Sequence, residues 1–317
     1  MSMQQMLLGT AAGASPAEGL FSVDLYTGTQ STKTITNDIN LSSDGGIVWI
    51  KKRNDSQPGQ VFDTVRGVKK HFRTDGVHAS FTTNNTVNTF NTDGFTLGSS
   101  DVTNETGDDY CAWTFGKASK FLDIVSWTGN WSAQTLNHSL GTTPGLIIAK
   151  QVEGADNWHI FTEAVGNTKA LYFGNSVPIT NSNFWNNTSP TSTQFTIGSN
   201  LSYNNRQHVA YLFPEEEAGL IKCSTYTGNS STQTINCGFK PQFLLIKCTS
   251  TSSTDWQIYD TTRGMTSSSA KQLRPNDQGA EINETSGITP VSNGFTLTNN
   301  SDFNDSGQTY FYMAIVE

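Results

Sequence analysis

The sequence predicts an all-β chain that consists of three tandem antiparallel β-sandwich domains of the jelly-roll or lectin-like type. The first observation is composition: hydrophobic residues are 35% and charged residues 15% of the 317 residues, against averages of roughly 45–50% and 25% in globular proteins. Thr, Ser and Asn, which favour strands and turns, make up about a third of the chain instead. The other two observations are an internal repeat of about 100 residues and short apolar runs between turn residues.

The repeat is defined by five landmarks that occur in the same order three times. One landmark is GFTLG at 94–98, QFTIG at 194–198 and GFTLT at 294–298, so its copies are 100 residues apart. The others are turn glycines, lysines that end an apolar run, a turn segment and a closing segment. They are Gly28, Gly129 and Gly228; Lys51, Lys150 and Lys247; FDTVRG at 62–67, FTEAVG at 161–166 and YDTTRG at 259–264; and 110–115, 208–213 and 310–315. A unit of this length exceeds a solenoid repeat and matches one β-sandwich domain.

The predicted domains span 20–118, 119–217 and 218–317. The polar break at 214–219 marks the second boundary. The first boundary, at 116–120, is so short that we expect neighbouring domains to pack closely rather than swing on linkers. Because each repeat has its own aromatic and branched residues, we also expect each domain to bury its own core and to fold by itself.

Each strand expected in the first repeat has its own signal. Residues 20–27 alternate in polarity as a half-buried strand does, and 32–35 return after the turn at Gly28. The run 47–50 is continuously apolar, which is typical of a sandwich interior. The remaining expected strands are 60–63, 95–97 after the turn signal at 92–94, and the closing strand 110–115.

Residues 1–19 lie before the first repeat and differ from it in kind. They contain the one stretch with good helix formers and no β-branched residue, although it is too short to be a stable helix alone. Met3, Met6, Leu7 and Leu8 are predicted to be an assembly anchor that docks on a neighbouring subunit. The alternative is that this segment caps its own first domain.

Composition and charge exclude several classes of protein. The chain has no apolar run near the roughly 20 residues of a membrane helix, so we expect no membrane insertion. A net charge of -8 disfavours a nucleic-acid partner, which needs a basic face. Four cysteines are too few for a disulfide scaffold, and buried free thiols are expected. Pairing of Cys223 with Cys237, which flank one turn, is left open.

The sequence lacks the common catalytic and cofactor motifs. It has no GxSxG elbow, no phosphate-binding loop, no GxGxxG fingerprint and no HExxH. The acidic loops at 101–109 and 302–305 do not have the ligand spacing of an EF-hand. We therefore expect a protein that is not an enzyme and that holds no metal and no cofactor.

Two charged pairs recur with the repeat. Asp63 and Arg66 can pair across the FDTVRG turn, and Asp260 and Arg263 can do the same in YDTTRG. A pair that recurs without a nearby His or second carboxylate is typical of turn architecture. These four residues are predicted to be structural turn pairs, with ligand contact as the alternative. The middle repeat has no Arg in the equivalent segment.

Two of the seven tryptophans, Trp131 and Trp185, lie in segments rich in Asn, Ser and Thr. Aromatic rings among amide and hydroxyl groups are how many proteins stack sugar rings. Both residues are therefore candidate surface or glycan contacts, and packing in a core or interface is the alternative reading.

The landmarks together resemble a known repeat domain. Residues 47–53, 62–67, 90–98 and 107–113 look like a repeat found in structural proteins of tailed bacteriophages, especially phages of marine and cyanobacterial hosts. The opening MSMQQMLLGTAAG is similar to the start of many phage tail and fibre proteins. The resemblance covers essentially the whole chain and is weakest in the second repeat, which lacks the Trp-Ile-Lys and Arg-Gly elements.

The resemblance implies a virion component assembled in the host cytoplasm. Its expected partners are other virion proteins, further copies of the chain, with a trimer favoured, and a host-surface glycan or receptor. Three hypotheses follow: a tail or tail-fibre protein, a capsid decoration or head-fibre protein, and a glycan-degrading tailspike. The third needs two carboxylates about 5–9.5 Å apart in a groove, and no unique carboxylate pair stands out from the repeats.

Overall fold

Antiparallel β-strands provide almost all the regular structure of the chain. The computed structural model describes residues 15–174, 176–285 and 287–317. Within these ranges the helical elements are the single turn α1 (Asp101–Asn104) and the 3-10 turn η2 (Ser199–Leu201). None of the helices in the described ranges is long and apolar enough to cross a membrane. The predicted all-β class is confirmed.

Lobe 1 is built from the first nine strands. They are β1 (Phe21–Thr27), β2 (Lys33–Thr36), β3 (Gly46–Lys52), β4 (Gln60–Asp63), β5 (Lys70–Arg73), β6 (Phe81–Thr82), β7 (Val87–Asn91), β8 (Gly94–Leu97) and β9 (Asp109–Gly116). They form one sheet in the order β1-β9-β3-β4-β5-β6 and a second in the order β2-β8-β7.

Lobe 2 contains the next eight strands. They are β10 (Asp123–Thr128), β11 (Gln134–Asn137), β12 (Pro144–Gln151), β13 (His159–Thr162), β14 (Lys169–Ala170), β15 (Ile179–Thr180), β16 (Gln194–Ile197) and β17 (Gln207–Pro214). The main sheet has the order β10-β17-β12-β13, and two smaller sheets pair β11 with β16 and β14 with β15.

Lobe 3 contains the remaining strands. They are β18 (Glu216–Glu217), β19 (Ile221–Thr227), β20 (Gln233–Asn236), β21 (Pro241–Cys248), β22 (Trp256–Asp260), β23 (Met265–Thr266), β24 (Ser269–Gln272), β25 (Ile282–Glu284), β26 (Ile288–Val291), β27 (Gly294–Leu297) and β28 (Thr309–Val316). Their sheets have the orders β18-β19-β28-β21-β22, β20-β27-β26 and β23-β24-β25. Because β18 pairs with β19, the third main sheet begins at Glu216, ahead of the boundary predicted at 218.

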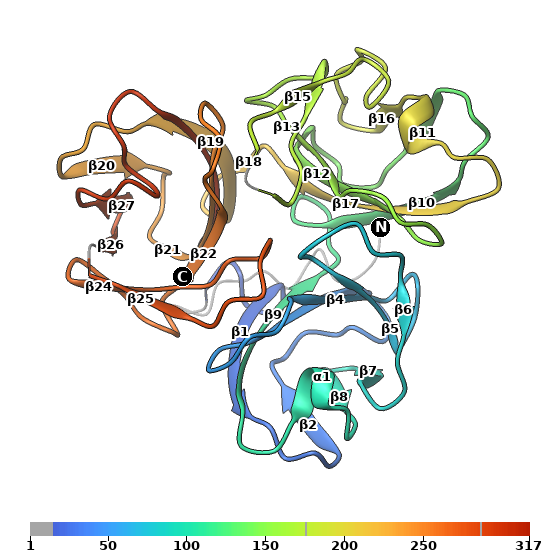
Figure 1. Cartoon of the computed structure of the whole chain (residues 1–317), viewed down its shortest axis with the longest axis horizontal. Coiled ribbons are helices and arrows are strands. Elements are labelled where there is room, and N and C mark those ends of the chain that lie inside the picture. The colour runs from blue at the N-terminus through green and yellow to red at the C-terminus, as the bar shows by residue number, and fades with distance from the viewer. Residues whose placement is uncertain (1–14, 175, 286) are drawn as a thin grey trace.

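The same pairing scheme recurs in all three lobes. The last strand of each lobe lies between an early strand and the apolar central strand: β9 between β1 and β3, β17 between β10 and β12, and β28 between β19 and β21. Phe21 lies opposite Phe115 in lobe 1, and Ile221 lies opposite Ile315 in lobe 3. Figure 1 shows the three lobes arranged around a common centre.

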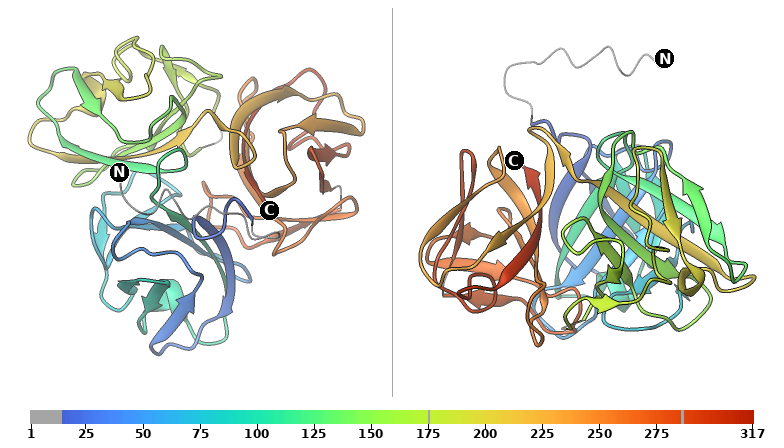
Figure 2. Two further views of the ribbon diagram at one scale, coloured as in Figure 1. Left: turned by 180° about the vertical axis from the view of Figure 1, so that it is seen from behind. Right: turned by 90° about the horizontal axis from the view of Figure 1, so that it is seen from above.

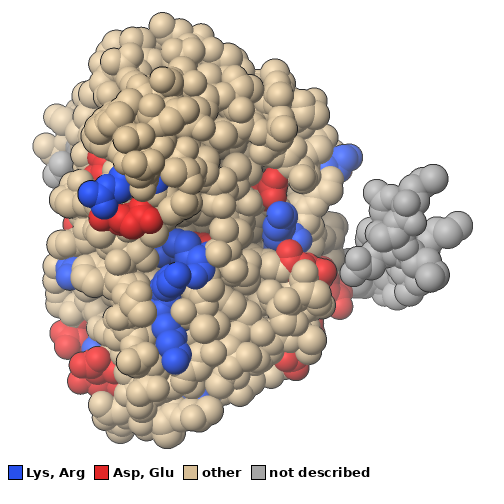
Figure 3. Space-filling model, turned by 90° about the vertical axis from the view of Figure 1, so that its right-hand side faces the viewer, with Lys and Arg blue, Asp and Glu red and all other residues tan. Residues whose placement is uncertain are grey.

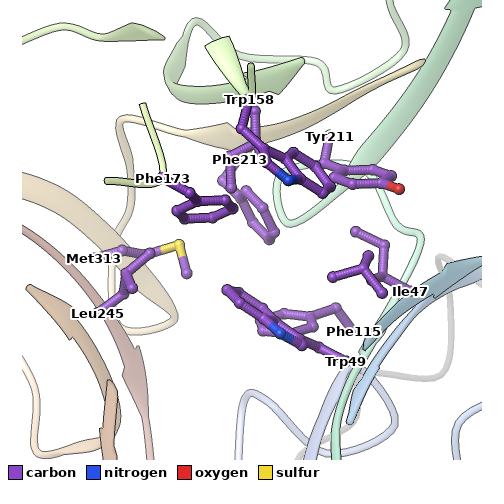
Figure 4. A pocket seen from close by; sticks show the side chains of 11 residues that line it. Ile47, Trp49, Phe115, Trp158, Phe173, Tyr211, Phe213, Leu245 and Met313 are labelled. Carbon is purple, nitrogen blue, oxygen red and sulfur yellow. The ribbon is translucent and has the colours of Figure 1, made fainter. Parts of the chain in front are cut away.

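The largest apolar core lies between the lobes. Trp49 and Phe115 of lobe 1, Trp158 and Phe213 of lobe 2, and Met313 of lobe 3 belong to one cluster of buried residues. They line a cavity of about 20 Å³ (Figure 4), which has room for about one water molecule and is too small for a ligand. The expected close packing of neighbouring domains is therefore confirmed.

Lobes 1 and 2 each have a further cluster of their own, whereas the interior of lobe 3 is continuous with the shared core. The expectation that every repeat buries a separate core is therefore wrong for lobe 3, because its apolar strands pack toward the common centre.

The chain ends of the described structure lie together. The Ser15 hydroxyl donates a hydrogen bond to the main-chain carbonyl of Glu317 over 2.7 Å, and Figure 2 shows the start of the coloured ribbon at the same end of the molecule as the C-terminus. Ala17 is buried in the shared core. Residues 15–19 therefore belong to the folded body, and the predicted anchor residues Met3, Met6, Leu7 and Leu8 lie outside the described residues.

Candidate functional site

Both predicted turn pairs form buried ion pairs. The Nε of Arg66 lies 2.5 Å from Asp63 Oδ2, and the Nε of Arg263 lies 2.6 Å from Asp260 Oδ2. In each turn the Asp also accepts the main-chain N–H of the Arg over 2.8 Å. The i, i+3 spacing of the sequence thus places carboxylate and guanidinium on the same side of a tight turn.

Each carboxylate also accepts a hydrogen bond from a neighbouring lobe. The Tyr211 hydroxyl of lobe 2 donates to Asp63 over 2.8 Å, and Trp113 Nε1 of lobe 1 donates to Asp260 over 3.0 Å. Tyr211 and Trp113 occupy the same position in their closing strands, β17 and β9. The two pairs therefore join lobe 1 to lobe 2 and lobe 3 to lobe 1, which their local sequence does not reveal.

The third junction, between lobes 2 and 3, lacks the carboxylate, the guanidinium and the polar aromatic donor of the other two. In the repeat, Thr162 and Val165 stand where the other lobes have Asp and Arg, and Met313 stands where they have Trp or Tyr. A buried donor without its acceptor, or a buried charge without its partner, costs free energy. The missing pair of the middle repeat is thus matched by a methionine in the third.

A second ion-pair group reinforces the junction between lobes 1 and 3. Arg53 donates two hydrogen bonds of 2.9 Å to the Glu281 carboxylate, and Arg263 Nη1 lies 3.3 Å from the same carboxylate. Burial acts to raise the pKa of Glu281, but the hydrogen bonds from Arg53 and the charge of Arg263 outweigh it and hold that pKa below its usual range.

The three landmark lysines are buried in equivalent positions. The Nζ of Lys51 donates to the Gln57 carbonyl over 2.9 Å, that of Lys150 to the Asp156 carbonyl, and that of Lys247 to the Thr254 carbonyl over 2.6 Å. Burial lowers the pKa of each lysine to about 8. Each ammonium is enclosed and holds the loop that follows its own central strand.

The described residues contain no group of three or more His, Cys, Asp or Glu side chains that could hold a metal ion. All four cysteines are free and buried, so Cys223 and Cys237 do not pair in this structure.

Trp131 and Trp185 have opposite environments. Trp185 is 1% exposed and packs edge-on against Phe161 in the core of lobe 2. The predicted surface contact is therefore wrong for Trp185, because the turn at 181–188 folds Phe184 and Trp185 inward. Trp131 is 59% exposed, and the other six tryptophans are nearly or fully buried.

Trp131 occupies a costly position. It lies at the tip of the β10–β11 turn with a φ of 62°, in the left-handed region. The equivalent residues are Gln30 and Ser230, with φ values of 50° and 54°. A left-handed non-glycine residue costs about 1–2 kcal/mol, and a large exposed indole adds unburied apolar surface. Neither property stabilises the fold.

The neighbouring loop at 202–207 holds this turn in place. The Trp131 N–H donates to the Ser202 carbonyl over 2.6 Å, and Asn205 N–H donates to the Gly129 carbonyl over 2.9 Å. A Cβ on Gly129 would lie 2.1 Å from the Tyr203 carbonyl oxygen, which explains the landmark glycine. The approach of the two loops therefore requires glycine at this position.

A ladder of aromatic rings connects Trp131 to the core of lobe 2. Tyr203 packs edge-on against Trp131 with centroids 5.0 Å apart, and the His208 ring lies nearly parallel to Tyr203. His208 in turn stacks on buried Trp127 with centroids 5.2 Å apart. The equivalent stacks, Tyr26 on Tyr110 in lobe 1 and Tyr226 on Tyr310 in lobe 3, are buried pairs.

Lobe 2 also contains buried polar atoms without a protein partner. Among the described residues of this lobe they are Trp185 Nε1, His208 Nε2, His159 Nδ1 and Asp156 Oδ2, and the last two are 3.8 Å apart. Burial lowers the pKa of His159 to about 3 and that of His208 to about 4. In lobes 1 and 3 the position of His159 is held by Gln60 and Gln257. Both histidines are therefore neutral at pH 7.

These features define a class of protein. It is an all-β protein of three packed lobes, in which buried Asp–Arg and Glu–Arg pairs lie at the junctions and the second lobe exposes one aromatic ladder to solvent. The chain belongs to the family described as Domain of unknown function (DUF7483), whose sequence model matches residues 17–317. That match runs through all three lobes and starts close to the buried Ala17. No curated protein matches the chain.

Proposed function

We propose that the protein is a non-enzymatic structural component of a bacteriophage virion, located in the tail or tail fibre, where it contributes to assembly and host-surface attachment. The observation that carries the structural role is the closed ring of lobes. Buried carboxylates that are paired with Arg lie at its junctions: Asp63 and Asp260 each accept a hydrogen bond from a neighbouring lobe, and Glu281 of lobe 3 pairs with Arg53 of lobe 1. The resemblance of the repeats to phage structural proteins supports the location.

We further propose that each lobe is a β-sandwich domain of the jelly-roll or lectin-like type. In lobe 1, Val48 and Ile50 of the large sheet share a buried cluster with Ile35, Phe95 and Leu97 of the small sheet. Two sheets that bury one apolar cluster between them are the defining feature of a sandwich. Such domains suit a particle component because they are rigid and present loops at their ends.

The threefold arrangement of the lobes favours one alternative, a capsid decoration or head-fibre protein. The same closing-strand contact occurs at two of the three junctions, from Tyr211 to Asp63 and from Trp113 to Asp260. A single chain with this arrangement fits a local threefold position on a shell, and it also fits the end of a trimeric fibre. The expected self-association into a trimer belongs to the same proposal.

Labelled particles test this proposal. Antibodies against the purified protein, detected with gold on intact phage, are expected to mark the tail. Label on the shell would favour the decoration role, and absence of the protein from purified particles would overturn both. As a control for the enzymatic hypothesis, incubation with isolated host polysaccharide should release no reducing ends.

A further inference from the structure

We propose that the Trp131–Tyr203 pair of lobe 2 is a binding site for a neutral pyranose sugar. This inference deepens the attachment role proposed above and depends on that role for its biological setting. Its physical basis is separate: an aromatic side chain is exposed and packed against a second ring at one of three equivalent positions.

Internal repetition separates structural residues from the rest. Residues that the fold needs recur in all three lobes, such as the turn glycines and the buried lysines. Trp131 does not recur, since Gln30 and Ser230 fill the same turn with polar side chains. The left-handed backbone is common to all three turns, but the exposed indole is present in one of them, and folding of the turn does not require it.

The geometry suits stacking of a sugar ring. The Trp131 and Tyr203 rings lie with their centroids 5.0 Å apart and their planes at 64°, so they offer a sugar two aromatic surfaces of different orientation; this pair is called the aromatic corner. Tyr203 is backed by the stacked rings of His208 and Trp127, and His208 is 1% exposed. A preorganised corner of this kind loses little side-chain entropy when a ligand binds.

Amide groups around the corner supply hydrogen bonds. Asn130 Oδ1 accepts from the Ser132 N–H over 2.9 Å and from the Ser202 hydroxyl over 3.1 Å, so its NH2 group is the part left to meet a ligand. Gln207 Nε2 is fixed by Thr128 Oγ1 at 2.8 Å. Such donors and acceptors match the hydroxyl groups on the edge of a pyranose ring.

The charge distribution favours a neutral ligand. Figure 3 views the molecule from the side on which the β10–β11 turn of lobe 2 lies, and the upper part of that face is almost free of Lys, Arg, Asp and Glu. Arg206 is the one charged residue of the 202–207 loop. A site for acidic sugars would be expected to present several cations.

The test uses the fluorescence of the purified full-length protein. Because the other six tryptophans are almost fully buried, iodide should quench Trp131 selectively. The probes are cellotetraose, mannotetraose and triacetylchitotriose, with trigalacturonate as the acidic comparison. We expect at least one neutral probe to protect Trp131 from iodide in a saturable manner. The same titration followed by calorimetry supplies a readout that does not depend on Trp131 fluorescence.

Variants show whether Trp131 and Tyr203 bind the sugar or only lie near it. W131G should weaken binding by roughly ten-fold or more and should unfold at the same or a higher temperature, because glycine relieves the left-handed strain. Y203A should weaken binding and Y203F should retain it. Q30G and S230G make the same backbone change in lobes 1 and 3 and should bind as the unchanged protein does.

Several results would overturn the assignment: no protection by any neutral probe, unchanged binding by W131G, or preference for trigalacturonate with strong salt dependence. None of these depends on where the protein sits in a particle. Failure of the sugar site and failure of the virion role are therefore distinguishable.

Discussion

The polar groups at the lobe junctions depend on one another, and this dependence leads to a prediction about the free energy of unfolding. The junction between lobes 1 and 2 uses Asp63, Arg66 and Tyr211, whereas that between lobes 2 and 3 uses Thr162, Val165 and Met313 at the same positions. The triple variant D63T/R66V/Y211M places the residue types of the junction between lobes 2 and 3 in that between lobes 1 and 2. We expect it to lose far less stability than the sum of the losses in its three single variants.

The magnitudes follow from burial. Asp63 and Arg66 side chains are 0% and 5% exposed, so D63T leaves a buried guanidinium without its partner and should cost about 3–5 kcal/mol. R66V leaves a buried carboxylate and should cost a similar amount. Y211M removes a donor to that carboxylate and should cost about 1–3 kcal/mol.

The triple variant removes the charges and the donor together, and such replacement of a buried ion pair by apolar groups is often close to neutral. The Val61 carbonyl, which accepts from Arg66 Nη2 over 2.9 Å, loses its partner. We therefore expect a net cost of about 1–3 kcal/mol for the triple variant, well below the sum of the single costs.

Urea unfolding of the four variants and the unchanged protein measures these free energies. The control is T162S, a small change at the equivalent position of the apolar junction, which should alter stability little. If the triple variant costs as much as the three single variants added together, the polar sets are not coupled and the reasoning is refuted.

Three further predictions concern pH and lobe autonomy. Because burial lowers the pKa of Lys51, Lys150 and Lys247 to about 8 from an unfolded value near 10.5, the unfolded chain binds more protons in that window. Stability should therefore rise from pH 8 toward pH 10, and K247M should flatten this rise in urea midpoints; a flat profile in the unchanged protein would contradict it. Above pH 10 the buried tyrosines, whose pKa values are raised, should reverse the trend. At acid pH, burial keeps the pKa of His159 at about 3 in the folded state, against 6.5 in the unfolded chain. The unfolded chain therefore binds more protons below pH 6.5, and stability should fall as the pH drops. H159Q, which places the residue type of Gln60 and Gln257 at this position, should reduce the loss at pH 5 by about 2 kcal/mol. An equal loss in H159Q and unchanged protein would assign the acid effect elsewhere. Finally, residues 218–317 expressed alone should bind a hydrophobic dye and unfold without a sharp transition, because the interior of lobe 3 is continuous with the shared core; a cooperative transition in this fragment would show that lobe 3 folds independently.

Much of the local structure could be read from the sequence because its causes are local. Strand alternation, the turn glycines and the i, i+3 spacing of Asp63 and Arg66 each depend on a few neighbouring residues. The carboxylates' second partners could not be predicted, because Tyr211 and Trp113 reach them from other lobes. One signal was available: Thr162, Val165 and Met313 depart from the repeat together.

The two candidate tryptophans show the same limit. Trp131 and Trp185 have similar sequence surroundings, yet one is exposed and the other is in the core. Composition describes a segment, whereas burial depends on which way the folded segment turns. The position within the repeat was more informative, since Trp131 aligns with turn-tip residues Gln30 and Ser230 and Trp185 does not.

The contact between Ser15 and Glu317 has a consequence for chain connectivity. Since the two residues touch at one end of the molecule, a short linker could join them without moving any lobe. New ends could then be opened at 117–120, between lobes 1 and 2, where the chain crosses the surface outside the strands. The circularly permuted protein would keep every junction of the ring. Which lobe comes first along the chain therefore does not determine which lobes contact one another in space.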